Sequence, residues 1–266
     1  QVKNNPDELL KILDNVQMEL FSGRSGPIWI DIPLDFQWAE IHKKIIAKTE
    51  KIKEKISIPD ELIDALKSAK RPVFILGYGC RLAKKNKDLI NYCQENKIPY
   101  VLTWNTLDFS SYSNKENCGL LGISGTRDAN LVVDYSDLVV GFGTHLSKML
   151  TGDKLEDFAP DAKSIYLFDI DSNEFERFKK EERFKCIKLD LRDLNLLSLP
   201  TNIAKIEKWV TLYTLLKGLR KHKIIEECQK EIPPLSINQY KIYYKINSLI
   251  KSDDLIVIDG GGNVLF

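Results

Sequence analysis

Short apolar runs and amphipathic stretches alternate through the middle of the chain, between residues 59 and 190. Each run is bounded by turn residues and has the length of a buried strand, and each stretch has the apolar spacing of a helix. The predicted strands are 72–76, 99–103, 138–142, 164–169 and 186–189, and the predicted helices are 60–69, 84–95 and 126–134. This alternation predicts an α/β fold with a parallel, Rossmann-like sheet covered on both faces. Such a sheet binds its ligands at the carboxyl ends of its strands.

The two ends of the chain follow a different pattern. Residues 6–20 have helical spacing, and the apolar run 27–33 between two prolines predicts a buried strand. Residues 37–56 are rich in lysine and predict a solvated connection. After Asp190 the predicted helices cover 209–219 and 237–250, and a last apolar run follows at 255–258. The sequence therefore has one regular central region between two less regular ends.

Charge and cysteine content exclude several classes of protein. The 266 residues include 39 basic and 38 acidic side chains, a formal net charge of +1, so neither nucleic acid nor a membrane surface is the expected partner. No apolar run has the roughly 20 residues that span a bilayer. The five cysteines form no CxxC pair, which argues against a structural zinc site and is simplest in a reducing, cytoplasmic location.

The two termini indicate a piece of a longer protein. The chain starts at Gln1 rather than Met, and it stops at Phe266, a few residues after the apolar run 255–258. Because a protein rarely ends just past a buried strand, we expect that both ends are cuts.

The turn Gly77-Tyr78-Gly79 follows a predicted strand and precedes a predicted helix, as the glycine turn of a dinucleotide site does. The third glycine of that pattern is replaced by Leu82, and the next predicted strand ends at Thr103 rather than at an acidic residue. Two interpretations stay open. The glycines form a tight turn at a strand end, or they form the wall of a nucleotide pocket or of its vestige.

Two further positions are candidates for ligand contact. The segment from Gly122 to Asp128 precedes a predicted helix, where free amides together with Arg127 can hold an anion, although capping of the helix by Thr126 explains the pattern equally well. His145 follows the strand 138–142 at the expected ligand edge of the sheet. No Ser or Cys partner and no histidine cluster is identifiable, so both a structural and a ligand-binding role stay open.

The segment Asp259-Gly260-Gly261-Gly262-Asn263 is the most chemical-looking part of the chain. Three glycines allow backbone amides to approach a ligand closely, and a helix starting there would direct its positive end at a phosphate. Taken alone, a glycine turn is only moderately specific.

Several segments together resemble one family, the thiamine diphosphate-dependent enzymes of the acetolactate synthase group. Residues 23–35 resemble the G-R-x-G-P-V-x-I-D-x-P-x-D segment that closes their first domain, and residues 71–79 resemble the opening strand and turn of their central domain. The rest of that domain is matched in order by Gly125–Gly143, Leu150-Thr151-Gly152, Phe158–Lys163 and Phe168–Asp171. Residues 259–263 resemble the diphosphate-contacting turn that opens their third domain.

The resemblance implies a division of the chain into parts of three α/β domains. The central one is a whole Rossmann-like (DHS-like) domain, and the α/β domains on either side are truncated. The expected segments are 1–36, the end of the pyrimidine-binding domain; 37–56, a linker; 57–192, the central domain; 193–235, a helical linker; and 236–266, the start of the diphosphate-binding domain.

The resemblance also implies the cofactors. Thiamine diphosphate with Mg²⁺ is expected in the complete protein, with Gly261, Gly262 and Asn263 at the diphosphate. Relatives that bind FAD carry a G-A-R-F-D-D-R-V-T-G stretch, whose two arginines are here His145 and Met149. That difference argues against FAD. It favours a relative whose central domain no longer needs flavin, such as those found with surface-sugar pathways, although a flavin-free anabolic acetolactate synthase remains open. Gly77, Gly79, Thr126 and Asp169 are candidates for a vestigial nucleotide pocket.

The implied activity is that of a transferase or lyase acting on a 2-oxo acid or a related carbonyl, by decarboxylation or carboligation, in a homodimer or homotetramer. The family's catalytic glutamate and its Gly-Asp-Gly…Asn metal motif have no counterpart in these residues. We therefore expect no catalytic residue and no metal ligand in this chain, and no activity of the piece alone. The alternative is a nucleotide-binding or regulatory module built on the same central fold.

Overall fold

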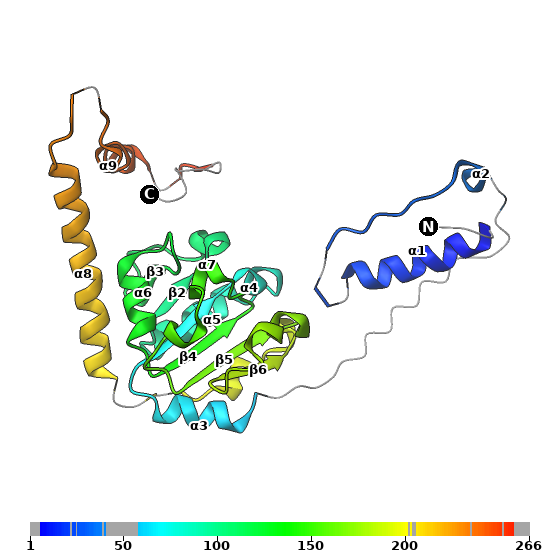
Figure 1. The fold of residues 1–266 in the computed structure, drawn as a ribbon, viewed down its shortest axis with the longest axis horizontal. Helices are drawn as coiled ribbons and strands as arrows, with labels where there is room; N and C mark the ends of the chain where they lie inside the picture. The colour runs from blue at the N-terminus through cyan, green and yellow to red at the C-terminus, as the bar shows by residue number, and fades with distance from the viewer. Residues whose placement is uncertain are drawn as a thin grey trace.

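A computed structural model describes residues 6–21, 23–24, 26–38, 40, 58–201, 203, 206–234, 236–251 and 253–257. At its centre is one six-stranded, all-parallel sheet with the strand order β3-β2-β1-β4-β5-β6 (Figure 1). The strands are β1 (Pro72–Leu76), β2 (Tyr100–Leu102), β3 (Asn117–Leu120), β4 (Leu138–Phe142), β5 (Ser164–Asp169) and β6 (Phe184–Lys188). The predicted α/β class and the parallel sheet are confirmed.

Helices connect and flank these strands. The α-helices are α1 (Pro6–Phe21), α2 (Leu34–Gln37), α3 (Asp60–Ser68), α4 (Tyr78–Leu82), α5 (Asn86–Glu95), α6 (Arg127–Asp134), α7 (Lys148–Thr151), α8 (Glu207–Gln229) and α9 (Gln239–Leu249). Shorter 3₁₀ turns are η1 (Trp104–Phe109), η2 (Leu155–Asp157), η3 (Ser172–Phe178), η4 (Leu191–Asp193) and η5 (Leu196–Ser198). Within the described residues, no helix is both long and apolar enough to cross a membrane.

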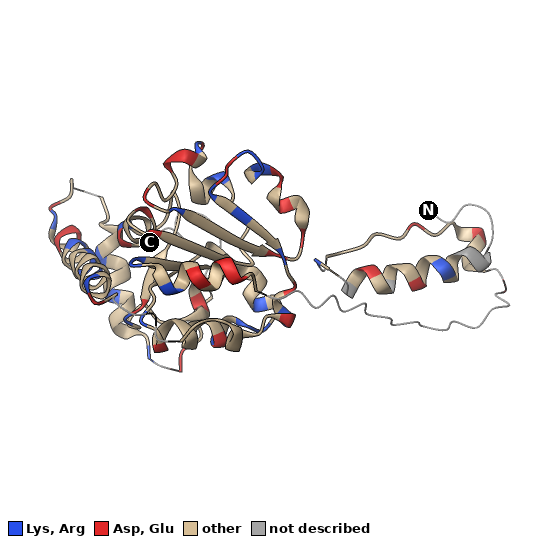
Figure 2. Cartoon of the chain, turned by 90° about the horizontal axis from the view of Figure 1, so that it is seen from below, with Lys and Arg blue, Asp and Glu red and all other residues tan. Residues whose placement is uncertain are grey.

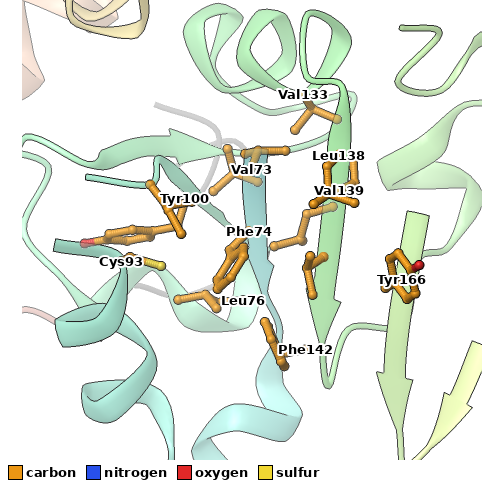
Figure 3. Close-up of a cluster of buried hydrophobic side chains, with 14 of the residues drawn as sticks. Val73, Phe74, Leu76, Cys93, Tyr100, Val133, Leu138, Val139, Phe142 and Tyr166 are labelled. Carbon is orange, nitrogen blue, oxygen red and sulfur yellow. The ribbon is translucent and has the colours of Figure 1, made fainter. Parts of the chain in front are cut away.

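The central strands are apolar throughout because both faces of the sheet are covered. Every residue of β1 and β4 is buried. Phe142 lies between Phe74 and Phe168, with a ring-centroid distance of 5.2 Å to each, so one aromatic row crosses three neighbouring strands. Figure 3 shows Phe74 and Phe142 among the aliphatic side chains of this core. The continuous apolar runs of the sequence are thus the signature of a sheet packed on both sides.

The edges of the sheet differ from the prediction. Residues 117–120 were expected to lie in a polar loop, but they form β3, which is buried and pairs with β2 through an irregular register. The segment Asn117-Cys118-Gly119-Leu120 contains no β-branched residue, so nothing local marks it as a strand. At the other edge, β6 starts at Phe184, two residues earlier than predicted.

The predicted buried strand at 27–33 is wrong. Residues 26–33 are extended but have no strand partner among the described residues, and Trp29 is 93% exposed. The described part of the last apolar run, 255–257, is likewise unpaired and exposed. A strand needs a neighbouring backbone for its hydrogen bonds, and the described residues offer none to either run. The rest of the predicted connection, 41–57, lies outside the described residues.

The first half of α8 packs on the sheet domain. Trp209 is 1% exposed and donates its indole N–H to the Pro72 carbonyl at 2.9 Å. Tyr213 is buried as well, and Lys217 donates to the Asn114 carbonyl at 2.6 Å. Although residues 193–235 were predicted to be a linker, we propose that the central domain extends through this half of α8. The packing surface comes from Trp209, Tyr213 and Leu216.

Candidate ligand-binding site

The strand order creates a crossing point between β1 and β4. The chain runs from β1 outward through β2 to β3, and then returns to β4 on the other side of β1. In open parallel sheets, ligands bind in the crevice outside the carboxyl ends of the strands at such a point. The loops that meet there begin with Gly77 after β1 and Gly143 after β4.

The glycines at this point allow two backbones to touch. The amide of Gly77 donates to the Phe142 carbonyl at 3.0 Å, and the amide of Gly79 donates to the Gly143 carbonyl at 2.9 Å. A Cβ on Gly77 would lie 2.2 Å from the Gly143 oxygen, which no side chain can tolerate. Gly143 itself has φ +55°, and a Cβ there would lie 2.6 Å from the Cα of Gly79. Tight backbone packing therefore explains the Gly77-Tyr78-Gly79 turn.

A cavity of about 660 Å³ lies along the carboxyl edge of the sheet. The loops after β1, β2, β4, β5 and β6 all contribute to it. One part of its wall is apolar or aromatic, and it comes from Tyr78, Leu82, Ala83, Trp104, Met149 and Leu150. Another part is charged, and it comes from Arg24, His145, Asp169, Asp190 and Arg192. The volume is within the range of small-molecule sites.

The cations of this wall are already paired with carboxylates. Arg24 and His145 both bond to Glu174, whose side chain is largely buried. Arg192 donates from Nε to both carboxylate oxygens of Asp190, at 2.9 and 2.8 Å. The neighbouring positive groups lower the pKa of Glu174 although burial opposes them, so this carboxylate stays ionised and holds its partners.

Asp169 is the carboxylate at the end of β5 and lines the cavity. Burial raises its pKa, and the amide of Asp171, which donates to Oδ1 at 3.0 Å, partly opposes that shift. A partly desolvated carboxylate gains from any hydrogen-bond donor placed against it. Asp169 is therefore the strongest polar acceptor that the cavity offers.

Sequence comparison identifies the domain that carries this cavity. The model of the family described as "Thiamine pyrophosphate enzyme, central domain" matches residues 59–188. These are the residues of the sheet from before α3 to the end of β6. The chain belongs, through these residues, to the thiamine pyrophosphate enzyme family. The resemblance found from the motifs is thereby confirmed, and the cavity is a feature of the central domain.

Individual relatives of this thiamine pyrophosphate enzyme chain are acetolactate synthases. The chloroplastic acetolactate synthase 1 of Nicotiana tabacum is 32% identical over 65% of the chain. The large subunit of Corynebacterium glutamicum is 30% identical over 81%, and the isozyme 1 large subunit of Escherichia coli K12 is 27% identical over 96%. The chain spans 27%, 35% and 44% of the length of these three relatives, respectively.

The structure separates the residues that were grouped as a vestigial nucleotide pocket. Gly79 and Asp169 line the cavity, and Gly77 supports the same turn from behind. Thr126 lies elsewhere: it caps α6, accepting from the Ala129 amide at 3.4 Å and donating to the Cys118 carbonyl at 3.3 Å. Arg127, the other candidate in that segment, is exposed. The capping interpretation therefore accounts for the 122–128 segment.

Several cavity residues were not singled out from the sequence. Trp104, Asp190 and Arg192 follow β2 and β6, and only the position after a strand end could have indicated them. His145 and Met149, where FAD-binding relatives carry arginines, both line the cavity. The predicted diphosphate residues Gly261, Gly262 and Asn263 lie outside the described residues. Within the described part, no three His, Cys, Asp or Glu side chains form a potential metal site.

Proposed function

We propose that the complete protein is a thiamine diphosphate-dependent enzyme that makes or breaks a C–C bond next to the carbonyl of a 2-oxo acid, as acetolactate synthase does. The match of residues 59–188 to the family's central domain carries this proposal. The similarity of 96% of the chain to an acetolactate synthase large subunit supports it, because that alignment reaches the segments on both sides of the domain.

Binding of the cofactor is assigned to the turn at the carboxyl end of the chain. Gly261 and Gly262 offer backbone amides without side-chain obstruction, and Asn263 adds a side-chain amide, so this donor set fits a diphosphate. Thiamine diphosphate, when bound with Mg²⁺, supplies the carbanion chemistry of the reaction. The role that we assign to these three residues is to hold the diphosphate and orient the cofactor.

The central domain has a supporting role in this proposal. Its cavity lies at the carboxyl edge of a rigid sheet, and no residue of it is assigned to catalysis. Because His145 and Met149 supply no fixed positive charge where FAD-binding relatives have arginines, we propose that the enzyme works without FAD. The segments 1–36 and 236–266 are proposed parts of the pyrimidine- and diphosphate-binding domains, in a cytoplasmic homodimer or homotetramer.

A nucleotide-binding module without catalysis is the competing proposal. It requires the glycine turn after β1 to face a phosphate. The amides of Gly77 and Gly79 instead donate to backbone carbonyls of the β4 loop. This observation favours the enzyme over the module.

The test is thermal unfolding of the protein produced from the complete gene. Thiamine diphosphate with Mg²⁺ is expected to raise its Tm, whereas thiamine, which lacks the diphosphate, is not. Asn263→Ala should weaken the shift, and Asn15→Ala, an exposed position of α1, serves as the matched control. The same preparation should consume pyruvate, and the 266-residue chain alone should not. Absence of any shift with the complete protein would refute the proposal.

A further inference from the structure

We propose that the cavity of the central domain binds an uncharged ligand that combines a flat ring with hydroxyl groups, the chemistry of a nucleoside, and that it discriminates against nucleotide diphosphates. This inference concerns the cavity itself and does not depend on carboligation by the complete protein. Three features of the cavity carry it: the state of its backbone amides, the pairing of its charges, and the composition of its wall.

The first feature is that the glycine turn has spent its amides. Phosphate binding at such a turn requires backbone N–H groups that point at the ligand. Gly77, Gly79 and Cys80 donate instead to the carbonyls of Phe142, Gly143 and Gly77, at 3.0, 2.9 and 3.1 Å. The helix that follows, α4, has only five residues and adds little dipole. The backbone therefore offers no phosphate cradle at this turn.

The second feature is the charge balance. Each arginine that lines the cavity is paired: Arg24 with Glu174, and Arg192 with Asp190. Asp169 adds a carboxylate, and Asp171 lies 4.0 Å from Arg24. Counting these groups, carboxylates outnumber the arginines, so a diphosphate would be repelled unless it broke an existing ion pair. Figure 2 likewise shows basic and acidic residues interspersed along the ribbon, without a basic stretch dominating any element of the central domain.

The third feature is what the wall offers to an uncharged molecule. Tyr78 and Trp104 provide aromatic surface for a flat ring, with Met149 beside them in the lining. Asp169 provides an acceptor for hydroxyl groups. The hydroxyl of Thr144 is buried in the same wall and has no hydrogen-bond partner among the described residues. Aromatic surface beside neutral and acceptor groups fits a ring that carries hydroxyls.

Isothermal titration of the 266-residue chain with matched probes tests this inference. Adenosine and ADP share the ring and the sugar and differ in the diphosphate, and riboflavin and FMN form a second pair that differs in one phosphate. We expect adenosine to bind with a Kd at least tenfold lower than ADP, and riboflavin to bind more tightly than FMN. Equal or tighter binding of ADP or FMN would overturn the inference, and so would failure of both uncharged probes to bind.

Variants locate the binding in the cavity. Asp169→Asn and Tyr78→Ala should each weaken adenosine binding about tenfold. Asp161→Asn is the matched control, because Asp161 pairs with Arg71 away from the cavity lining. An unchanged adenosine affinity in both cavity variants would place the ligand elsewhere and overturn the inference.

A double substitution tests the charge argument separately. Glu174→Gln with Asp190→Asn removes the carboxylates that neutralise Arg24 and Arg192. We expect the affinity for ADP to rise at least fivefold while the affinity for adenosine stays within twofold of the wild type. If ADP binding does not respond, charge pairing is not what excludes phosphate, and the discrimination part of the inference fails.

Discussion

The central domain and the flanking segments use the same kinds of apolar residue in opposite ways. In the domain, Trp209 is 1% exposed and hydrogen-bonded to the start of β1. In the flanks, Trp29 is 93% and Trp38 85% exposed, and Leu255 and Val257 are similarly open. The difference shows that an apolar run is buried only where the chain also supplies the surface that covers it.

The contrast also separates stability from the proposed chemistry. The sheet and the first half of α8 contain nearly all of the buried apolar residues of the described chain. The turn assigned to the cofactor diphosphate belongs to the carboxyl-terminal flank, at residues 261–263. We therefore expect substitutions in the central domain to change folding, and substitutions in the flanks to leave folding intact.

The largest expected effect comes from a pair of tryptophan substitutions. Trp209→Ala should lower the free energy of unfolding by about 3–5 kcal/mol, because it leaves a cavity and an unpaired Pro72 carbonyl. Trp29→Ala should change it by less than about 0.5 kcal/mol, because the side chain is already in solvent. Urea unfolding followed by circular dichroism measures both. Equal losses would remove the distinction between the two regions.

A pair of glycine substitutions sharpens the comparison at the backbone. Gly77→Ala should cost about 1–3 kcal/mol or more, because its Cβ would lie 2.2 Å from the Gly143 oxygen and 2.5 Å from the Thr144 Cα. Gly26→Ala, in the amino-terminal flank, has no atom within 4 Å of its Cβ and should be neutral within about 0.5 kcal/mol. The midpoints of thermal unfolding compare the two variants. A neutral Gly77→Ala would contradict the packing described for the crossing point.

The smallest effect is a pH dependence at Asp169. Burial raises the pKa of this carboxyl above its ordinary value of 3.8, so the folded state holds the proton more tightly than the unfolded state. Stability therefore falls as the pH rises through the interval between the two pKa values. Asp169→Asn lacks this loss and should be at least as stable as the wild type at neutral pH, with the advantage disappearing near about pH 3. Asp31→Asn, in the exposed flank, should change stability by less than about 0.5 kcal/mol at either pH.

The sequence predicted the interior of the fold better than its edges. Strands β1, β4 and β5 have the predicted bounds because buried parallel strands appear as unbroken apolar runs between turns. The edge strand β3 was missed, since its place is set by pairing with β2 rather than by its own residues. The run 27–33 looked like a strand for the same local reason as β1, and only the arrangement of the whole chain distinguishes them.

The candidate site was predictable in position and not in chemistry. The expectation of a ligand edge at the carboxyl ends of the strands agrees with the cavity, and Gly79 and Asp169 line it. The contact between Arg24 and Glu174 joins residues 150 positions apart, which no local pattern reveals. For the same reason, the sequence could not show that the amides of the glycine turn are consumed by the β4 loop.

Hydrogen exchange of the 266-residue chain, followed by mass spectrometry, tests the central claim most directly. That claim is that one packed domain holds the fold and that the flanks carry no core of their own. We expect the slowest exchange in β1, β4 and β5, and exchange close to that of an unfolded peptide in 26–33 and 253–257. Protection of the flanks equal to that of the central strands would contradict it.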